Sequence, residues 1–250
     1  MSQKTSTSTV DPDEIARFAK LAETWWDPKG PMKPLHKFNP LRIQYLRDAI
    51  CTHFNRDVKS AQPLDGLRII DIGCGAGMLS EPLARLGATV VGIDPAEKNV
   101  FIARAHAEGN GVTVSYVAET IEDVVARGET FDIVLAMEVV EHVADVPTFM
   151  KSCCTAVKPG GLLFMATLNR TMRSFALAIV GAEYVLRWLP RGTHQWEKFV
   201  TPDELTSAIK ANGVDIKEVR GVVYNPLRDQ WSLSNDTAVN YLVTAVKPSN

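Results

Sequence analysis

The sequence lacks any apolar run long enough to cross a membrane: no stretch of its 250 residues has the required length and uninterrupted apolarity. Basic residues are not in excess, since 27 lysines and arginines face 29 acids and the net charge is -2. That balance argues against a nucleic-acid partner, whose phosphates need clustered basic side chains. The first ten residues are rich in Ser and Thr without the apolar core of a secretory signal, so we expect a disordered tail over 1–10. The sequence predicts a cytoplasmic protein, and it leaves open a peripheral position on the inner face of the plasma membrane.

Cysteine is also scarce, and the four cysteines have no metal-ligand spacing. They are Cys51, Cys74, Cys153 and Cys154. We interpret them as small apolar residues in a reducing compartment. With 46% hydrophobic and 22% charged residues, the chain is long enough for one large core, and one domain with additions is expected.

The most informative stretch covers residues 69–78, where an apolar run ends in an acid and a glycine-rich loop. Asp71 is followed at alternate positions by Gly73, Gly75 and Gly77. The apolar run predicts a strand buried on both faces of a parallel sheet. The glycines would let a ligand lie against bare main chain, and the apolar spacing over 79–86 predicts a helix that starts from the loop.

The spacing of the glycines in this loop distinguishes between two kinds of nucleotide-like ligand. A dinucleotide fold requires G-x-G-x-x-G, but Gly77 comes one position early and Met78 stands where glycine is needed. Asp71 would repel a pyrophosphate but could accept a cationic group. An NAD-linked oxidoreductase is therefore disfavoured. The loop resembles the S-adenosylmethionine loop of class I methyltransferases, whose acid lies near the sulfonium-bearing methionyl end, and this implies that Asp71 and Gly75 belong to a cofactor site.

Strand-like runs alternate with helical stretches over the rest of the chain. The first five lie at 67–72, 88–93, 112–117, 131–136 and 161–167, and two more at about 214–224 and 237–247. This order predicts an α/β fold: a Rossmann-like, doubly wound, mostly parallel seven-stranded sheet over 61–250. Family resemblance implies that the last strand is antiparallel. Ligands of such sheets bind at the carboxyl ends of the strands.

Residues 11–60 predict an N-terminal helical arm. Helices are expected from about 11 to 26 and from about 39 to 54, with a proline-broken segment between them that contains Trp25 and Trp26. The arm could be packed on the core by its tryptophans, or it could be a lid over the ligand. Arg42 is either a surface charge or a clamp for the carboxylate of the ligand.

Acids at strand ends extend the predicted cofactor site. Asp94 ends the second strand at the place where an acid accepts both ribose hydroxyls, although a helix N-cap before Pro95 is the ordinary alternative. Glu119 ends the third strand and would either accept from the adenine amino group or be a solvated acid at a helix start. Met137 ends the fourth strand, and it would line the adenine pocket or only fill the core.

The turn after the fourth strand contains Glu138, Glu141 and His142. If the turn is helical, these side chains share a face. Two carboxylates and an imidazole could then hold a divalent cation or supply a general base. The alternative is a Glu-His pair that only orients the loop.

An insertion is expected over about 170–200. Residues 174–190 are apolar on most sides of a helical wheel, which predicts a packed core helix, a helix on an anionic membrane surface, or one that contacts an apolar ligand. The basic residues near it are Arg170, Arg173, Arg187, Arg191 and Lys198. Thr201 and Glu204 predict a capping box at the start of the next helix.

Several motifs outside the cofactor loop resemble the ubiquinone-biosynthesis O-methyltransferase family, over nearly the whole chain from residue 11. They include Trp25-Trp26-Asp27, Lys33-Pro34-Leu35-His36, Asn39-Pro40-Leu41-Arg42, Asp71-Ile72-Gly73-Cys74-Gly75, Glu138-Val139-Val140-Glu141-His142-Val143 and Thr167-Leu168-Asn169-Arg170. One departure is Ala76, where relatives often carry glycine. The resemblance implies S-adenosylmethionine contacts for Arg42, Gly73, Asp94 and Met137. It also implies that Glu138, Glu141 and His142 form the catalytic site and hold a divalent cation of the Mg²⁺ type.

The resemblance further implies methylation of a ring hydroxyl on polyprenylated catechol-type or quinol substrates at two points of the pathway. These are 3-demethylubiquinol to ubiquinol, and 2-polyprenyl-6-hydroxyphenol to its methoxy product. An enzyme complex of the same pathway is a possible partner. Two alternatives stay open: a C-methyltransferase that acts on a quinone ring, and a non-catalytic scaffold that binds S-adenosylmethionine or quinone.

Overall fold

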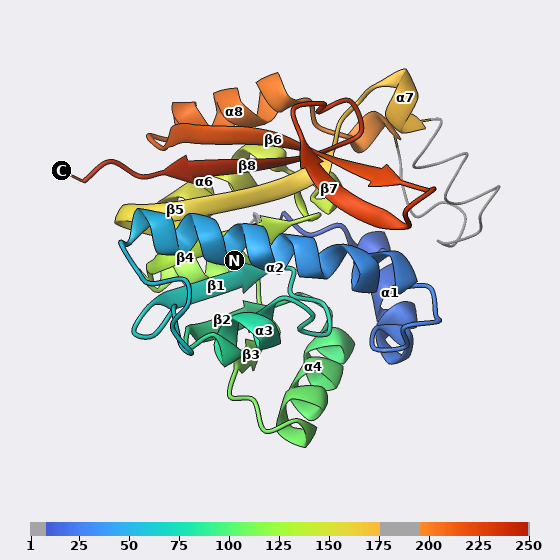
Figure 1. The fold of residues 1–250 in the computed structure, drawn as a ribbon, viewed down its shortest axis with the longest axis vertical. Coiled ribbons are helices and arrows are strands. Elements are labelled where there is room, and N and C mark those ends of the chain that lie inside the picture. Colours follow the sequence, from blue (N-terminus) through green and yellow to red (C-terminus); the bar gives the residue numbers. More distant parts are fainter. Residues whose placement is uncertain (1–8, 176–195, 250) are drawn as a thin grey trace, which may run out of the picture.

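In the computed structural model of the protein, residues 9–175 and 196–249 are described, and they form one mixed sheet covered by helices (Figure 1). The sheet order in this part of the chain is β3-β2-β1-β4-β5-β8-β6-β7. The strands are β1 (Arg68–Ile72), β2 (Thr89–Ile93), β3 (Ser115–Val117), β4 (Phe131–Met137), β5 (Val157–Leu168), β6 (Asp215–Asn225), β7 (Gln230–Ser234) and β8 (Asn240–Val246).

Strands β1 to β5 run parallel, and β8 enters antiparallel between β5 and β6. The doubly wound, mostly parallel sheet and its antiparallel last strand are therefore confirmed. The described residues contain eight strands instead of the seven expected, because β7 forms a hairpin with β6. In β7 only Trp231 and Leu233 are large and apolar, which is too weak an alternation to predict a strand.

The helices form a layer on each face of the sheet. They are α1 (Pro12–Leu21), α2 (Lys33–His53), α3 (Ser80–Arg85), α4 (Glu97–Gly109), α5 (Ile121–Ala126), α6 (Val146–Ala156), α7 (Met172–Ser174) and α8 (Pro202–Ala211), with short 3-10 turns η1 (Ala22–Thr24), η2 (Val140–His142) and η4 (Trp196–Lys198). Helices α2 and α3 pack on one face, while α5, α6 and α8 pack on the other. The capping box of Thr201 and Glu204 opens α8 as expected.

The strands contribute apolar side chains to the cores on both faces of the sheet, which explains why each strand is a continuous apolar run. In β1, Ile69 packs with residues of α2 and α3, whereas Ile70 and Ile72 pack with residues of α5 and α6. Full burial of each such side chain stabilises the fold by roughly 1.5–3 kcal/mol. This double core fixes the carboxyl ends of β1, β2 and β4 at one edge, where the polar loops meet.

Helix α2 begins at Lys33 and not near Asn39 as expected. Pro34 is tolerated because it lies in the first turn, where its missing N–H has no helical partner. Pro40 lies inside the helix and removes one hydrogen bond. The helix continues across it because one face is buried against the sheet, and that packing outweighs local propensity. The buried apolar residues of this face are Phe38, Tyr45, Leu46, Ile50 and Cys51.

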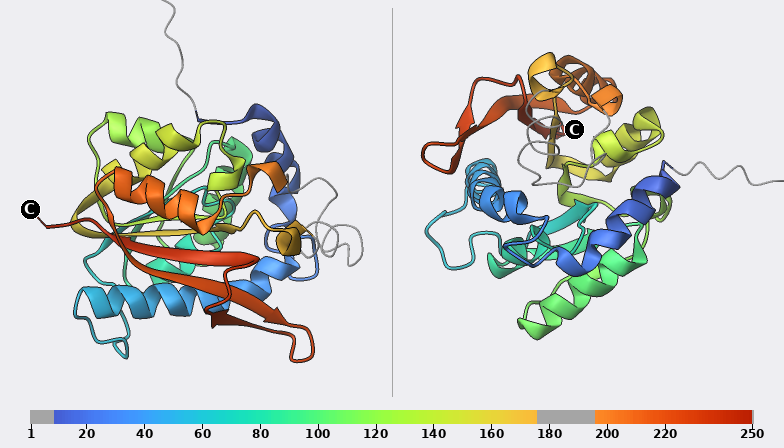
Figure 2. Two further views of the ribbon diagram at one scale, coloured as in Figure 1. Left: turned by 90° about the horizontal axis from the view of Figure 1, so that it is seen from above. Right: turned by 90° about the vertical axis from the view of Figure 1, so that its right-hand side faces the viewer.

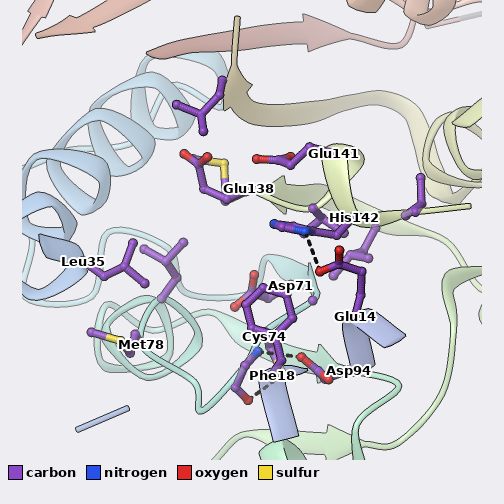
Figure 3. A pocket seen from close by; sticks show the side chains of 18 of the residues that line it. Glu14, Phe18, Leu35, Asp71, Cys74, Met78, Asp94, Glu138, Glu141 and His142 are labelled. Atoms are coloured by element: carbon purple, nitrogen blue, oxygen red, sulfur yellow. Dashed lines mark hydrogen bonds and ion pairs between the residues drawn. The ribbon is translucent and has the colours of Figure 1, made fainter. Parts of the chain in front are cut away.

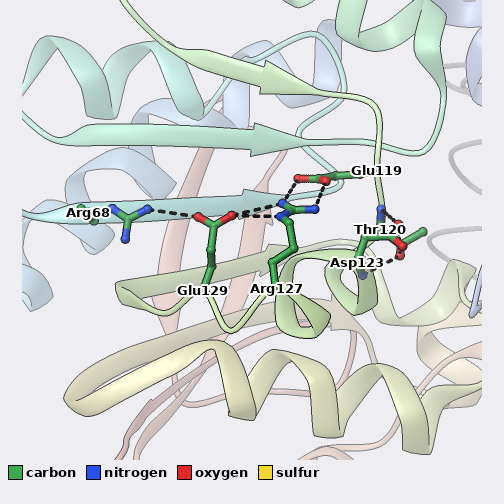
Figure 4. Close-up of polar contacts among 6 residues, drawn as sticks. All are labelled: Arg68, Glu119, Thr120, Asp123, Arg127 and Glu129. Carbon is green, nitrogen blue, oxygen red and sulfur yellow. Dashed lines mark hydrogen bonds and ion pairs between the residues drawn. The ribbon is translucent and has the colours of Figure 1, made fainter.

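An ion-pair network links the residues before and after α5 (Figure 4). Thr120 and Asp123 form a capping box at the start of α5. Arg127 donates to both carboxylate oxygens of Glu119, at 2.6 and 2.9 Å, and pairs with Glu129 at 3.2 Å. Glu119 also lines the cavity described below, so its contact with adenine stays a prediction.

The N-terminal arm lies across the carboxyl edge of the sheet, with α1 beside α4 (Figure 2, right). Its first described residues are tied to the chain that follows η2. Val10 forms an antiparallel bridge with Val143, and the Thr9 carbonyl accepts from the Ala144 N–H at 2.7 Å. The predicted tail over 1–10 lies largely outside the described residues.

The described helices include none that is both long and apolar enough to cross a membrane. All four cysteines are buried and unpaired, as the scarcity of cysteine and its spacing predicted. Burial raises the pKa of the Cys74 and Cys153 thiols well above the usual value, so both remain protonated at neutral pH.

Candidate active site

A cavity of about 830 Å³ lies at the carboxyl edge of the sheet (Figure 3). Its wall is built by the loop after β1, the turn after β4, the N-terminal arm and the β6–β7 hairpin. All the predicted site residues lie on this wall: Arg42, Asp71, Gly73, Gly75, Asp94, Met137, Glu138, Glu141 and His142. The structure therefore brings the two predicted groups of residues, for cofactor and for chemistry, into one cavity.

The glycine loop is covered by the arm. Gly75 has φ +53°, and a Cβ at this position would lie 2.7 Å from Cη2 of Trp25. Trp26 donates its Nε1–H to the Ala76 carbonyl at 3.0 Å. The two tryptophans thus pack the arm onto the loop, which supports the packed-arm interpretation; movement as a lid remains a prediction.

Asp71 ends β1 with its side chain almost fully buried. Ser80 donates its hydroxyl to Oδ2 of Asp71 at 2.6 Å, which ties the strand end to the first turn of α3. Burial raises the pKa of Asp71 to about 6, against the opposing effects of the Ser80 hydrogen bond and the Arg42 charge. A buried carboxylate of this kind favours a cationic group beside it.

Asp94 joins the glycine loop to the start of α4. Its carboxylate accepts from the Gly75 N–H at 3.0 Å, from the Ala96 N–H at 2.8 Å and from Asn99 Nδ2 at 3.3 Å. Burial raises the pKa of Asp94, while these three donors lower it. Ala96, and not Asp94, is the N-cap residue of α4, so the alternative role predicted for Asp94 is wrong.

Arg42 reaches the cavity from α2 and is only 4% exposed, which excludes the surface-charge interpretation. Its Nη2 donates to Oε1 of Glu138 at 2.6 Å, and its guanidinium lies 4.2 Å from the centre of the Phe38 ring. A buried guanidinium at a cavity wall is suited to binding a carboxylate.

Glu138, Glu141 and His142 line the same cavity, but the helical turn that would place them on one face is not formed. Glu138 has a left-handed backbone, φ +60°, and the turn that follows is a short 3-10 helix, so helical spacing does not apply. Glu138 pairs with Arg42, and His142 Nδ1 lies 3.1 Å from Oε2 of Glu14. Among residues 9–175 and 196–249 no group of three His, Cys, Asp or Glu side chains could hold a metal ion.

Glu141 is the most unusual carboxyl group of the cavity. It is almost fully buried, and its Oε2 has no hydrogen-bond partner in the described part of the chain. Burial raises its pKa well above the usual value, and the nearby charge of Glu138 raises it further. Both effects favour the protonated form of the Glu141 carboxyl group.

Sequence reasoning missed the contribution of α1. Glu14 and Phe18 line the cavity and contact His142, although the sequence marks Glu14 only as an acid in the first turn of a helix. No local pattern links two residues 128 positions apart, so only the fold could reveal this pair.

Most of the predicted apolar helix, 174–190, lies outside the described residues. The described start of the insertion exposes two large apolar side chains, Met172 and Phe175. Three of the flanking basic residues are paired with acids: Arg170 with Glu204, Arg173 with Asp236, and Lys198 with Asp11.

Comparison with known proteins gives the class. The model of a family described as "Methyltransferase domain" matches residues 70–165. Magnesium protoporphyrin IX methyltransferase from Synechocystis, solved with bound S-adenosylhomocysteine (SAH), superposes with a TM-score of 0.63 at 18% identity, covering 94% of this chain and 93% of that one. A possible histamine N-methyltransferase from Thermotoga maritima gives 0.61 at 18% identity, covering 94% and 98%. The family model thus defines residues 70–165 as a methyltransferase domain, and the solved methyltransferases share the fold of this chain.

Curated relatives give the family. The ubiquinone biosynthesis O-methyltransferase of Methylobacterium nodulans is 62% identical over 99% of each chain. The enzymes of the same name from Bradyrhizobium and Rhizobium etli are 61% and 58% identical, covering 98% and 97% of this chain and 96% and 98% of theirs. The chain belongs to the ubiquinone biosynthesis O-methyltransferase family.

Proposed function

We propose that the protein transfers the methyl group of S-adenosylmethionine to a ring hydroxyl of polyprenylated, catechol-type ubiquinone precursors. The two reactions are 3-demethylubiquinol to ubiquinol, and 2-polyprenyl-6-hydroxyphenol to its methoxy product. The observation that carries the proposal is that the methyltransferase loop and the imidazole of His142 face one cavity. The high identity to relatives named for this activity supports it.

We propose the following cofactor contacts, which the residues on the cavity wall support. Arg42 binds the carboxylate of the methionyl group, Asp71 lies near its sulfonium end, and Asp94 accepts from the ribose hydroxyls. Gly73 and Gly75 offer bare main chain, and Met137 packs against the adenine. Burial supports these roles, because charge-assisted hydrogen bonds are strongest where water is excluded.

Methyl transfer requires a nucleophile, the methyl carbon and the sulfur in line at near-attack distance. A phenolic hydroxyl ionises near pH 10, so a base must take its proton. Nε2 of His142 accepts that proton, the oxygen bonds to the methyl carbon, and the sulfur leaves as a neutral thioether. The apolar side chains on the cavity wall exclude water and suit a prenylated ring; Phe18, Leu35, Phe38, Phe149 and Trp231 are among them.

A divalent cation of the Mg²⁺ type is a separate part of the proposal. The donor set of Glu138, Glu141 and His142 fits a hard cation in its chemistry, and the unpartnered oxygen of Glu141 is a free ligand atom. Their arrangement does not yet fit, since Glu138 is paired with Arg42. A bound cation would lower the pKa of the catechol hydroxyls. We expect chelation to abolish turnover, and full turnover in excess chelator would leave His142 as the sole base.

We also propose a cytoplasmic location with peripheral membrane contact through about 174–190, and an association with other enzymes of the pathway. The exposed Met172 and Phe175 at the start of this segment support contact with an apolar phase. The division into tail (1–10), arm (11–60) and methyltransferase domain (61–250) with a cap over about 170–200 belongs to this proposal. Deletion of 174–190 should reduce co-sedimentation with phosphatidylglycerol vesicles and turnover of long-chain substrate; unchanged values for both would make the segment merely structural.

The test of the main proposal uses purified protein, S-adenosylmethionine, a short-chain demethylubiquinol and a prenylated hydroxyphenol. Mass fragmentation of the product should place the new methyl on oxygen. A methyl on ring carbon would favour the C-methyltransferase, and S-adenosylmethionine binding without any product would favour the scaffold.

A further inference from the structure

His142 makes a hydrogen bond that comes from the arm and not from its own turn. Its Nδ1 lies 3.1 Å from Oε2 of Glu14, and the side chain of Glu14 is only 6% exposed (Figure 3). Phe18, one turn further along α1, packs edge-on against the imidazole with 5.0 Å between ring centres. Helix α1 thus holds the ring of His142 by one polar and one aromatic contact.

The charge of Glu14 decides which nitrogen of His142 carries the hydrogen. Two cationic side chains, Arg17 and Lys198, lie within ion-pair distance of the Glu14 carboxylate, which favours its ionised form. An ionised carboxylate can only accept hydrogen bonds. In the neutral imidazole the hydrogen therefore lies on Nδ1, and the lone pair lies on Nε2.

Two basic residues contact Glu14 in addition to His142. Arg17 Nη1 lies 3.2 Å from both carboxylate oxygens of Glu14. Lys198 Nζ lies 3.7 Å from Oε1 of Glu14 and 2.9 Å from Oδ2 of Asp11. Lys198 belongs to η4, so the described end of the insertion contacts the same carboxylate that contacts the imidazole.

The neighbouring carboxyl groups do not replace Glu14. Glu138 is paired with Arg42, and Glu141 has no hydrogen bond to the imidazole among the described residues. In the part of the chain that the structure describes, Glu14 is the acid that hydrogen-bonds to His142. A packing helix that served only for stability would not need a buried carboxylate here, because burying a charge is costly unless it is paired.

We propose that Glu14 is a positioning residue for methyl transfer: it fixes the Nδ1–H tautomer of His142 and turns Nε2 toward the substrate hydroxyl. The inference rests on the proposed function, in which His142 accepts that proton. Its consequence is that the arm completes the reaction site as well as covering the cofactor loop. Turnover then requires α1 to be docked, even when the cofactor is already bound.

The test compares Glu14→Ala, Glu14→Gln and Asp13→Asn. Glu14→Ala removes the acceptor, whereas Glu14→Gln keeps an acceptor oxygen at nearly the same place without the charge. Asp13→Asn is the matched control, because it removes an exposed acid from the same turn of α1. We expect kcat of Glu14→Ala to fall about 10- to 100-fold, the loss typical when a carboxylate that orients a functional imidazole is removed. The quinol KM and the Kd for SAH should stay near the wild-type values.

Two further results separate positioning from folding. Glu14→Gln should recover part of the lost kcat, and ¹⁵N spectra should show His142 moving from the Nδ1–H form toward a mixture of tautomers in Glu14→Ala. The signal is assigned among the five histidines by comparison with His142→Gln. A kcat equal to that of Asp13→Asn, a loss confined to KM or to the Kd for SAH, or an unchanged tautomer would overturn the inference. Absence of wild-type turnover would instead refute the proposed function, while the spectra would still test the pair.

Discussion

Arg42 and Glu138 form a partly buried ion pair, with 2.6 Å between Nη2 and Oε1, where α2 meets the end of β4. Glu138 reaches this position from a left-handed backbone, a conformation that costs a non-glycine residue roughly 1–2 kcal/mol. The pair lies on the wall of the cavity that the glycine loop and His142 also line. Because guanidinium has five donors, Arg42 can also bind the carboxylate of the cofactor.

Arg42→Met should raise the Kd for SAH about 10- to 100-fold. A hydrogen bond to a charged group contributes about 1.5–3 kcal/mol, and methionine keeps the length of the side chain without its donors. Titration calorimetry with SAH measures the change. Arg47→Met is the control, since Arg47 lies on the same helix, is partly exposed and pairs with Asp48. An unchanged Kd in Arg42→Met would remove Arg42 from the cofactor site.

Asp94→Ala should weaken cofactor binding by at least about tenfold, because the ribose hydroxyls and the Gly75 N–H lose the same acceptor. The effect on kcat at saturating cofactor should be small by comparison. Glu97→Gln, an exposed acid on α4, provides the control in the same titration. Equal dissociation constants for Asp94→Ala and the wild type would contradict the ribose assignment.

Gly75→Ala should destabilise the protein more than Gly128→Ala. Both glycines have positive φ, which costs alanine roughly 1–2 kcal/mol, but only the new Cβ at Gly75 would clash, with Trp25. Urea unfolding measures the free energy of unfolding of each variant, and the difference between the two variants gives the contribution of the contact between the glycine loop and the arm. Equal free energies of unfolding for the two variants would mean that Trp25 moves aside without a loss of stability.

Asp71→Asn should raise the free energy of unfolding at pH 7 by roughly 1–3 kcal/mol. The carboxyl group of Asp71 has a pKa of 3.8 in the unfolded chain and of about 6 in the folded protein. Between pH 3.8 and 6 the proton is therefore bound mainly by the folded protein. Lowering the pH from 7 to about 4 therefore stabilises the wild type through Asp71, and this gain should be absent from the variant. Urea unfolding at pH 5 and 7 measures both effects, with the exposed Asp65→Asn as control.

The same variant should bind SAH and S-adenosylmethionine differently from the wild type. A carboxylate near the sulfonium favours the charged cofactor over the neutral product, so Asp71→Asn should reduce that preference. An unchanged ratio of the two dissociation constants would place Asp71 outside the methionyl end.

The strands of the parallel core could be predicted because each is a continuous apolar run bounded by glycine or acid. Arg68–Ile72 and Phe131–Met137 differ from the expected ranges by one residue at one end. Helix α2 was predicted to start too late, since the local preference of Pro40 hid the packing of Phe38 on the sheet. Strand β7 was missed because its stability comes from pairing with β6 and not from its own pattern.

That the predicted cofactor residues line one cavity followed from the sequence, because the loop and the strand ends are local features. Gly73, Gly75 and Asp94 lie where the strand order requires them. The reaction side did not follow, since it depends on one backbone angle at Glu138 and on contacts between distant segments. Neither a left-handed glutamate nor the pairing of Glu14 with His142 leaves a signature in the residues around it.

The bridge between Val10 and Val143 has a consequence for the order in which the protein assembles during synthesis. Val10 is synthesised before Val143, and more than half of the chain separates the two residues. The loop contacts of Trp25 and Trp26 can form once residues 75 and 76 have been made, but the bridge must wait until the chain has passed η2. The start of the arm therefore reaches its final position as a late event.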